Sequence, residues 1–336
     1  MITVENLTKS FPGKSSPVLA LREVNLEIDA GALYGVVGPA KSGKSTLARV
    51  VALQEKPDRG TVRLDGLNTA SLDGRRLREA RRQVAVLDPA PALNAERTIA
   101  GNVAAPLERL GVDGPQRRNR VGRVLDLVGL TQRATQQPGE LTEAQRRRVA
   151  IARALVAGPA VLLADDPTAG IPADEAGPVL TVLDRARAEL GVTVLLTTQE
   201  GSIVGRVCDE VAVLDSGRVI EHGTVLDLLA SPGSRIAETL LPAIDTPRAQ
   251  TAAYDRAADV VLIGFATVGA LLPEASMRFG VELATIGGGL ARVGDTPVAR
   301  FRIGVRGRQA DSALAWIADR GAHVTHLAKG PCSVAA

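Results

Sequence analysis

The segment GPAKSGKST at residues 38–46 has the spacing G-x-x-x-x-G-K-[ST] and carries the clearest chemical signal in the chain. Glycines allow backbone N–H groups to converge on phosphate oxygens, and the N-terminus of a following helix adds partial positive charge. At this spacing the lysine reaches the β- and γ-phosphates and the serine hydroxyl ligates magnesium. The segment therefore predicts a site for ATP and Mg²⁺. The residues that we assign to nucleotide binding here are Gly38, Pro39, Ala40, Lys41, Ser42, Gly43, Lys44, Ser45 and Thr46.

Two adjacent carboxylates end the apolar segment AVLLADDPT at 160–168. Asp165 falls at the end of an expected buried strand, where a carboxylate can hold the magnesium shell beside the phosphate loop. Asp166 follows directly and is placed to orient an attacking water. The alternative is a strand that simply ends in two solvated acids. The phosphate loop favours the first interpretation, which gives Ser45 and Asp165 as metal ligands.

The elements that must position these residues are typical of a doubly wound α/β sheet. Val24, Leu26 and Ile28 alternate with polar residues, which is the pattern of a half-buried strand. ALYGVVG at 32–38 is a continuous apolar run of the kind found in buried parallel strands, and a helix is expected from Lys44. Further strands are expected at 83–87, 160–165, 192–198 and 210–215, with helices between them.

The composition changes after about residue 240, which indicates a second domain. We expect the first domain at 1–238, a linker rich in proline and small residues at 239–257, and a C-terminal domain at 258–336. Within the last domain the order strand, helix, strand, turn, strand, helix, strand predicts a ferredoxin-like α+β sandwich. The pair Gly294-Asp295 is expected to form the turn between its middle strands.

Composition and charge narrow the class of protein. A net charge of +3 over 336 residues does not favour a nucleic-acid partner. The run Arg146-Arg147-Arg148 is expected to be a solvated helix face. Cys208 and Cys332 are far apart and fit a reducing cytoplasm. The N-terminal residues lack the apolar core of a signal peptide, and the apolar stretch at 260–272 is too short to cross a bilayer, so we expect no membrane span.

The motifs occur in the order seen in the ATPases of ABC transporters. The phosphate loop, ELTEAQRRRVAIARAL at 140–155, AVLLADDPT and the strand before Gln199 carry this resemblance, which covers residues 1 to about 235. With its C-terminal domain, which would be ACT-like, the whole chain resembles the ATPase subunit of bacterial methionine importers. The resemblance implies a homodimer that sandwiches two ATP molecules, each facing the signature helix of the partner. It also implies transmembrane permease subunits, a substrate-binding protein, and a peripheral place at the cytoplasmic face of the membrane.

Several residues of this sequence match the family pattern position by position. Phe11 falls where the family places an aromatic side chain that stacks on adenine, although a core phenylalanine is the alternative. Asp165 matches the magnesium-binding aspartate. Residues 38–46 match the phosphate loop, except that Ala40-Lys41 replaces a pair of small residues.

Other positions depart from the family pattern. Asp88 stands at the glutamine of the Q-loop, Asp166 at the catalytic glutamate and Gln199 at the switch histidine. Pro172 stands at the aspartate of the D-loop. The resemblance therefore assigns catalysis to Asp166, Gln199 and Asp88, with Asp88 as a further metal ligand. Because these residues depart from the family pattern, the active site is degenerate.

The family signature LSGGQ is replaced by Leu141-Thr142-Glu143-Ala144-Gln145, in which Thr142, Glu143 and Gln145 would face the nucleotide of the partner. Thr142 and Gln145 have the spacing of a capping box, so the helix should start well. Glu143 would place a carboxylate near the partner's γ-phosphate. At about 5 Å and an effective dielectric constant near 20, this repulsion is on the order of 3 kcal/mol. Alternatively, Glu143 points to solvent and only favours the helix dipole.

The expected function is an ATPase subunit that powers import of an amino acid, methionine, with slow turnover. A second hypothesis is a degenerate nucleotide-binding switch or assembly module with little ATPase activity, and a third is a soluble ABC protein without a membrane partner. In the C-terminal domain, Phe279, Val281 and Ile286 keep the apolar part of the family pattern, whereas a family asparagine is replaced around 282–284. An amino-acid effector and a purely dimerising domain therefore both stay open.

Overall fold

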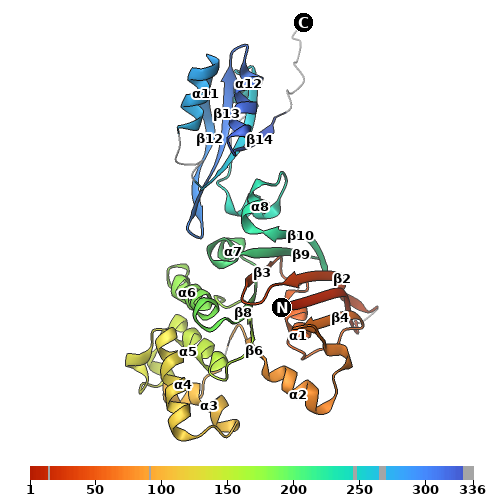
Figure 1. The fold of residues 1–336 in the computed structure, drawn as a ribbon, viewed down its shortest axis with the longest axis vertical. Helices are drawn as coiled ribbons and strands as arrows, with labels where there is room; N and C mark the ends of the chain where they lie inside the picture. Colours follow the sequence, from red (N-terminus) through yellow and green to blue (C-terminus); the bar gives the residue numbers. More distant parts are fainter. Residues whose placement is uncertain (14–15, 91, 245–247, 265–269, 328–336) are drawn as a thin grey trace. The chain divides into compact units, whose positions relative to one another are not determined.

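The computed structural model describes residues 1–336 except 14–15, 91, 245–247, 265–269 and 328–336, so that Cys332 lies outside the described residues (Figure 1). The chain forms two compact units, Met1–Gly223 and Thr224–Ala336. The division falls before the domain end that we expected at residue 238. The reason is that α8 (Val225–Ala230) lies against α9 (Arg235–Leu240) and against β11 (Arg256–Ile263), which belong to the second unit. The segment expected as a linker, 239–257, includes the short helix α10 (Arg248–Thr251) and the start of β11.

The first unit is built on a six-stranded sheet with the order β10-β9-β3-β8-β7-β6. The strands are β3 (Leu33–Val37), β6 (Val84–Leu87), β7 (Val161–Asp165), β8 (Thr193–Thr198), β9 (Glu210–Asp215) and β10 (Arg218–Thr224). The pairs β3–β8, β3–β9, β7–β8 and β6–β7 are parallel. This confirms the prediction of a doubly wound sheet.

Helices cover both faces of this sheet, which is why its inner strands β3, β7 and β8 are largely continuous apolar runs. Along β7, Leu162 and Ala164 belong to one hydrophobic cluster, whereas Val161 and Leu163 belong to another. The helices of the unit are α1 (Lys44–Val51), α2 (Gly74–Arg82), α3 (Ile99–Arg109), α4 (Gly114–Leu127), α5 (Glu143–Leu155), α6 (Ala173–Leu190) and α7 (Gly201–Val207). Single 3₁₀ turns lie at Thr69–Ser71, Thr131–Arg133 and Pro138–Glu140.

A second, antiparallel sheet of the first unit has the order β2-β1-β4-β5. Its strands are β1 (Ile2–Phe11), β2 (Val18–Ile28), β4 (Arg59–Leu64) and β5 (Leu67–Asn68). Val24, Leu26 and Ile28 are buried while the residues between them are exposed, as the alternation predicted. These side chains join the cluster that also holds Leu47 of α1, so the antiparallel sheet packs beside the helix that follows the phosphate loop.

The second unit carries a four-stranded antiparallel sheet with the order β12-β13-β11-β14. Its elements follow as β11, α11 (Leu271–Phe279), β12 (Glu282–Val293), β13 (Thr296–Arg306), α12 (Ala310–Asp319) and β14 (His323–His326). This is the predicted ferredoxin-like order. The predicted turn is confirmed, because Val293 pairs with Thr296 and Gly294 has a φ of 56°. In the part of the chain that the structure describes, no helix is long and apolar enough to span a bilayer.

Candidate nucleotide site

The loop at residues 38–43 joins the buried strand β3 to α1, and its glycines are required by close backbone contacts. A Cβ on Gly38 would lie 2.0 Å from the carbonyl oxygen of Leu214. Gly43 has a φ of +110°, and a Cβ there would lie 2.5 Å from the carbonyl oxygen of Ala20. No larger residue fits either position without moving the backbone, so the loop keeps a concave path that bare backbone can line.

The ammonium group of Lys44 lies inside this loop. Lys44 is only 8% exposed, and its Nζ donates to the carbonyl oxygens of Gly38 at 2.8 Å and Pro39 at 2.9 Å. Burial lowers the pKa of Lys44, while the charges of Asp165 and Asp166 raise it. A positive charge held by neutral carbonyls is suited to exchange them for phosphate oxygens, which bind an ammonium more strongly.

The turn between β9 and β10 fixes the loop from the other side. The N–H of Gly217 donates to the carbonyl oxygen of Ser42 at 2.9 Å, and its own carbonyl accepts from the N–H of Arg22 at 2.8 Å. Gly217 has a φ of +80°, and a Cβ there would lie 2.7 Å from the carbonyl oxygen of Ala20. This contact is not evident from the sequence. Its only signal was the Ser216-Gly217 pair, which is common in turns.

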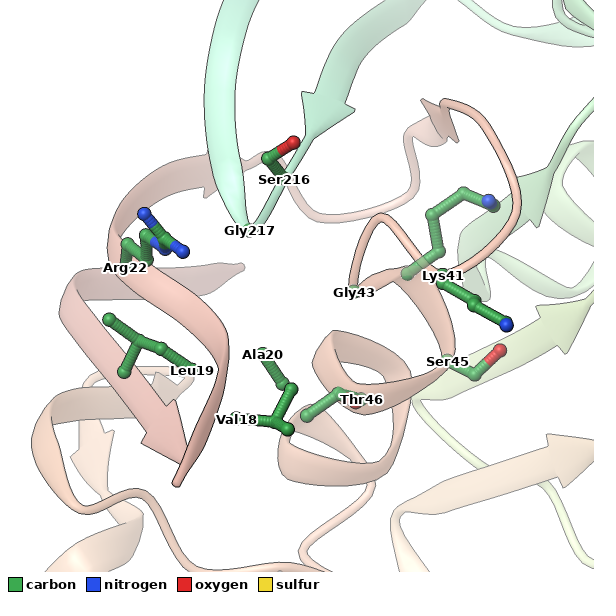
Figure 2. A pocket seen from close by; sticks show the side chains of 11 residues that line it. Val18, Leu19, Ala20, Arg22, Lys41, Gly43, Ser45, Thr46, Ser216 and Gly217 are labelled. Atoms are coloured by element: carbon green, nitrogen blue, oxygen red, sulfur yellow. The ribbon is translucent and has the colours of Figure 1, made fainter. Parts of the chain in front are cut away.

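A hollow of about 240 Å³ opens beside the loop (Figure 2). One wall consists of predicted nucleotide-binding residues, namely Lys41, Gly43, Lys44, Ser45 and Thr46. The other wall comes from β2 and the β9–β10 turn, with Val18, Leu19, Ala20, Arg22, Ser216 and Gly217. Phe11 is not among the lining residues, but it pairs with Val18 across β1 and β2 and so lies next to this wall. A mixed apolar and cationic hollow of this kind suits a nucleoside joined to phosphates.

The two predicted metal ligands are brought together at the end of β7. The Ser45 hydroxyl lies 3.3 Å from Oδ1 of Asp165, to which it donates. Within the described ranges, no cluster of three or more His, Cys, Asp or Glu side chains could hold a metal ion by itself. One hydroxyl and one carboxylate next to a phosphate loop nevertheless fit Mg²⁺, because that ion usually takes few protein ligands and completes its shell with phosphate and water oxygens.

Asp166 lies beside this pair and has a perturbed environment. Its backbone is left-handed, with a φ of 45°, a conformation that aspartate adopts more readily than most residues. Its N–H donates to the carbonyl oxygen of Thr197 at 2.8 Å. Burial raises the pKa of Asp166, and the charges of Asp165 and Glu200 raise it further, while Lys44 and the Thr198 hydroxyl oppose them. A carboxylate with a raised pKa is a better proton acceptor than a free one.

Asp88 and Gln199 follow β6 and β8, the two strands that flank β7, and both side chains are exposed. Leu87 is paired with Ala164, so Asp88 leaves β6 next to the point where Asp165 ends β7. Gln199 directly follows β8. Among the residues that the structure describes, no hydrogen bond or ion pair joins Asp88 or Gln199 to the phosphate loop or to the two aspartates.

The capping box predicted at the start of α5 is confirmed. The N–H of Gln145 donates to the Thr142 hydroxyl at 3.3 Å, and the N–H of Thr142 donates to the Gln145 side chain at 3.1 Å. Glu143 is exposed, and its carboxylate is ion-paired with the guanidinium of Arg146. The negative charge is therefore partly neutralised within the same turn, which neither of our interpretations of Glu143 included.

The solvated-face interpretation of Arg146–Arg148 is wrong for Arg147, which is 5% exposed. Its guanidinium donates to the carbonyl oxygens of Pro167 at 2.7 Å and Ala169 at 3.0 Å, and to that of Asp166 at 3.3 Å. Burial lowers its pKa, although the charges of Glu143 and Asp166 oppose this. Arg147 thus ties the signature helix to the loop that begins at Asp166.

In the second unit, two of the three residues that keep the family's apolar pattern, Phe279 and Val281, belong to the core between helices and sheet, whereas Ile286 does not. Phe279 contacts Trp316 edge-to-face at 6.2 Å between ring centroids, and Val281 is buried. Glu282, in the segment where the family asparagine is replaced, is ion-paired with Arg306 at 3.3 Å. These contacts explain the packing of the unit. They do not identify a binding site for an effector, which stays a proposal.

Comparison with known proteins gives two family matches, the ABC transporter family over residues 21–169 and the NIL domain over residues 256–326. The chain is 39% identical to a methionine import ATP-binding protein, MetN, of Thermobifida fusca, over 97% of this chain and 100% of that protein. It is 35% identical to a protein of the same description from Yersinia pestis, over 96% of this chain and 98% of that one.

Solved structures resemble the first unit. One is an ATP-binding cassette in a dimeric post-hydrolysis state bound to ADP and Pi, with a TM-score of 0.60 and 30% identity, covering 67% of this chain and 98% of that one. Another is CbiO1 of Clostridium perfringens, part of an ABC transporter complex, with a TM-score of 0.64 and 28% identity, covering 68% of this chain and 90% of that one.

Proposed function

The chain belongs to the family of methionine import ATP-binding proteins, which are ATPases of the ABC transporter type, and on that premise we propose that it hydrolyses ATP to power import of methionine. The observation that carries this proposal is the phosphate loop, with Lys44 inside it and Ser45 next to Asp165. That the chain binds a nucleotide follows from its membership of this family of ATP-binding proteins.

The phosphates bind to residues 38–46. Backbone N–H groups of the loop and the N-terminus of α1 face the phosphate oxygens, and Lys44 leaves the carbonyls of Gly38 and Pro39 to neutralise the β- and γ-phosphates. The nucleoside occupies the hollow against Val18 and Ala20, with Phe11 next to it for stacking on adenine.

Ser45 and Asp165 hold the magnesium ion, with Asp88 as a further ligand from the neighbouring strand end. When bound, Mg²⁺ neutralises the charge that develops on the phosphate oxygens. The hydroxyl of Ser45 lies within hydrogen-bond distance of the Asp165 carboxylate, so the two oxygens that would hold the ion are close together.

Asp166 accepts a proton from the attacking water and orients it. Its raised pKa and its place beside Asp165 and Lys44 support this role. Gln199, at the end of β8, donates a hydrogen bond to the γ-phosphate. Because glutamine carries no positive charge and cannot shuttle a proton as histidine does, we expect the chemical step to be slow.

We infer that two copies of the chain close on two ATP molecules, since a similar cassette is dimeric in its ADP-bound structure. Thr142, Glu143 and Gln145 at the start of α5 then face the nucleotide of the partner. The protein is peripheral at the cytoplasmic face of the membrane, docked on transmembrane permease subunits near residues 88–96. A substrate-binding protein delivers methionine from the other side, and methionine acts as an effector on the second unit.

The hypothesis of a degenerate module that scarcely hydrolyses ATP gains no support from the comparisons, because the matched relatives carry the name of import ATP-binding proteins. The hypothesis of a soluble ABC protein without a membrane partner gains none for the same reason.

The test is methionine uptake by proteoliposomes that contain this chain and its permease subunits. We expect ATP-dependent uptake of labelled methionine when the substrate-binding protein is added, and no uptake with Asp166→Asn. Uptake of a different amino acid with methionine excluded would contradict the substrate. Absence of ATP-dependent uptake of any amino acid would contradict the transport function.

A further inference from the structure

Thr197 is the register partner of Asp165 across β7 and β8, and its side chain is fully buried, at 0% exposure. The Thr197 hydroxyl donates a hydrogen bond to Oδ1 of Asp165. The same oxygen accepts from the hydroxyl of Ser45 at 3.3 Å. One carboxylate oxygen is therefore held from two sides, by the sheet and by the phosphate loop.

The packing around Thr197 does not explain why this residue carries a hydroxyl. The preceding residues of β8, Leu195 and Leu196, are apolar and buried, and valine has nearly the shape of threonine. A buried hydroxyl without a partner costs on the order of 1–3 kcal/mol, so strand packing alone favours valine here. The hydroxyl is compensated by its hydrogen bond to the carboxylate of Asp165.

We propose that Thr197 is a positioning residue that orients the Asp165 carboxylate for the divalent cation. This inference rests on the proposed function, in which Asp165 and Ser45 ligate Mg²⁺. The hydrogen bond restricts rotation of the carboxylate and keeps Oδ1 next to the Ser45 hydroxyl. Groups that orient metal ligands in this way typically change metal affinity by about 10–100-fold when they are removed.

The backbone and the side chain of Thr197 contact different aspartates, the backbone N–H of Asp166 and the carboxylate of Asp165, which allows the two effects to be separated. The carbonyl oxygen of Thr197 accepts the N–H of Asp166 at 2.8 Å, and a substitution of the side chain leaves this bond in place. Thr197→Val therefore removes only the hydrogen bond to Asp165. Thr197→Ser retains a hydroxyl on the same carbon.

Thr193 provides a matched control on the same strand. It is also buried, at 3% exposure, and its hydroxyl oxygen accepts from the N–H of Gly31 at 3.0 Å rather than from any group of the site. Thr193→Val makes the same chemical change at a place that does not contact Asp165. Any general effect of losing a buried hydroxyl from β8 should appear in this variant.

The experiment titrates the ATP-bound full chain with Mn²⁺, followed by its electron paramagnetic resonance, and measures binding of a fluorescent ATP analogue in EDTA. We expect Thr197→Val to weaken Mn²⁺ binding by about 10–100-fold with unchanged affinity for the analogue in EDTA. Thr197→Ser and Thr193→Val should bind Mn²⁺ as the wild type does. If Thr197→Val does not fold, Thr197→Ala is compared in the same way.

Equal Mn²⁺ affinity of Thr197→Val and the wild type would overturn the inference. A loss that Thr193→Val shares, or that Thr197→Ser does not rescue, would also overturn it and assign Thr197 to packing alone. A wild-type chain that binds the analogue but no Mn²⁺ would overturn the metal site together with this inference. Failure of the wild type to bind the analogue at all would overturn the proposed function first.

Discussion

The guanidinium of Arg146 is ion-paired with the carboxylate of Glu143 across the first turn of α5. Both side chains are partly exposed, at 36% and 58%, so the pair itself adds only about 0.3–0.5 kcal/mol to the stability of the helix. In the proposed dimer, the larger effect of this ion pair would be on the nucleotide bound by the partner. A carboxylate that replaces a glycine near a γ-phosphate is repelled by it unless a cation lies beside the carboxylate.

Removal of Arg146 should therefore weaken closure of the dimer on ATP. We expect Arg146→Gln to raise the ATP concentration for half-maximal dimer formation severalfold, measured by light scattering. The double variant Glu143→Gln with Arg146→Gln should return close to the wild type, since it removes the unpaired charge. If the single and double variants require the same ATP concentration, Glu143 does not face the phosphate.

Lys44 should account for much of the affinity for ATP. Its Nζ lies among the carbonyls of the phosphate loop, so Lys44→Ala removes the charge that faces the β- and γ-phosphates. We expect ATP binding to weaken at least about tenfold, or about 1.4 kcal/mol, by calorimetry. Lys56→Ala is the control, because Lys56 is an exposed lysine that lies outside the loop and outside the hollow. Equal affinity of Lys44→Ala and the wild type would refute the assignment of the loop.

Sequence alone was sufficient for the central parallel strands, for the strand at 24–28 and for the phosphate loop, because their signals are local. The apolar runs of β3, β7 and β8 are long enough to indicate buried parallel strands, and alternation indicated that Val24, Leu26 and Ile28 face a core. The loop adds a motif whose glycines the backbone requires at Gly38 and Gly43. In such segments, local propensity and final packing agree.

The residues that sequence analysis missed depend on contacts between distant segments. Gly217 reaches the loop at Ser42 only after the sheet has brought β9 beside β3. Thr197 looks like any β-branched strand residue until β7 and β8 are paired in register. Arg147 stands in a run of arginines whose burial is decided by the loop that packs over it, and no periodicity distinguishes it from Arg146.

The pH dependence of hydrolysis should report on Asp166. The group must be deprotonated to accept a proton, and its pKa is raised by burial, Asp165 and Glu200, so turnover should rise with pH over a range above the ordinary pKa of aspartate. Glu200→Gln removes one negative neighbour and lowers the pKa of Asp166. The rise in turnover should then occur at lower pH, measured as kcat under saturating Mg²⁺ and ATP.

The control for this profile is Glu79→Gln, which removes one exposed carboxylate of α2 that does not act on the pKa of Asp166. Its pH profile should equal that of the wild type. An identical profile for Glu200→Gln would mean that the titrating group is not Asp166.

The backbone at Asp166 gives a structural reason for the shorter carboxylate. A φ of 45° is tolerated by aspartate, whose short side chain can bond locally, and less well by glutamate. We therefore expect Asp166→Glu alone to lower the thermal stability slightly. The measurement is a melting curve of the full chain, with Asp165 intact. A higher melting temperature for Asp166→Glu would contradict the backbone argument.

Turnover itself is the strictest test of the site. Aspartate draws the carboxylate back by about one methylene relative to glutamate, and a misplacement of about 1 Å can cost on the order of a hundredfold in rate. Gln199 supplies a hydrogen bond without the charge of a histidine. Lys44, Ser45 and Asp165 stay in place to hold the nucleotide, so the loss should fall on the chemical step, with turnover well below about 1 per second and normal affinity for ATP.

The double variant Asp166→Glu with Gln199→His should raise turnover at least about tenfold, measured as phosphate release by the full chain with its permease. Wild-type turnover of several per second would instead mean that aspartate and glutamine suffice at this site, and that the position of the water is set by other groups.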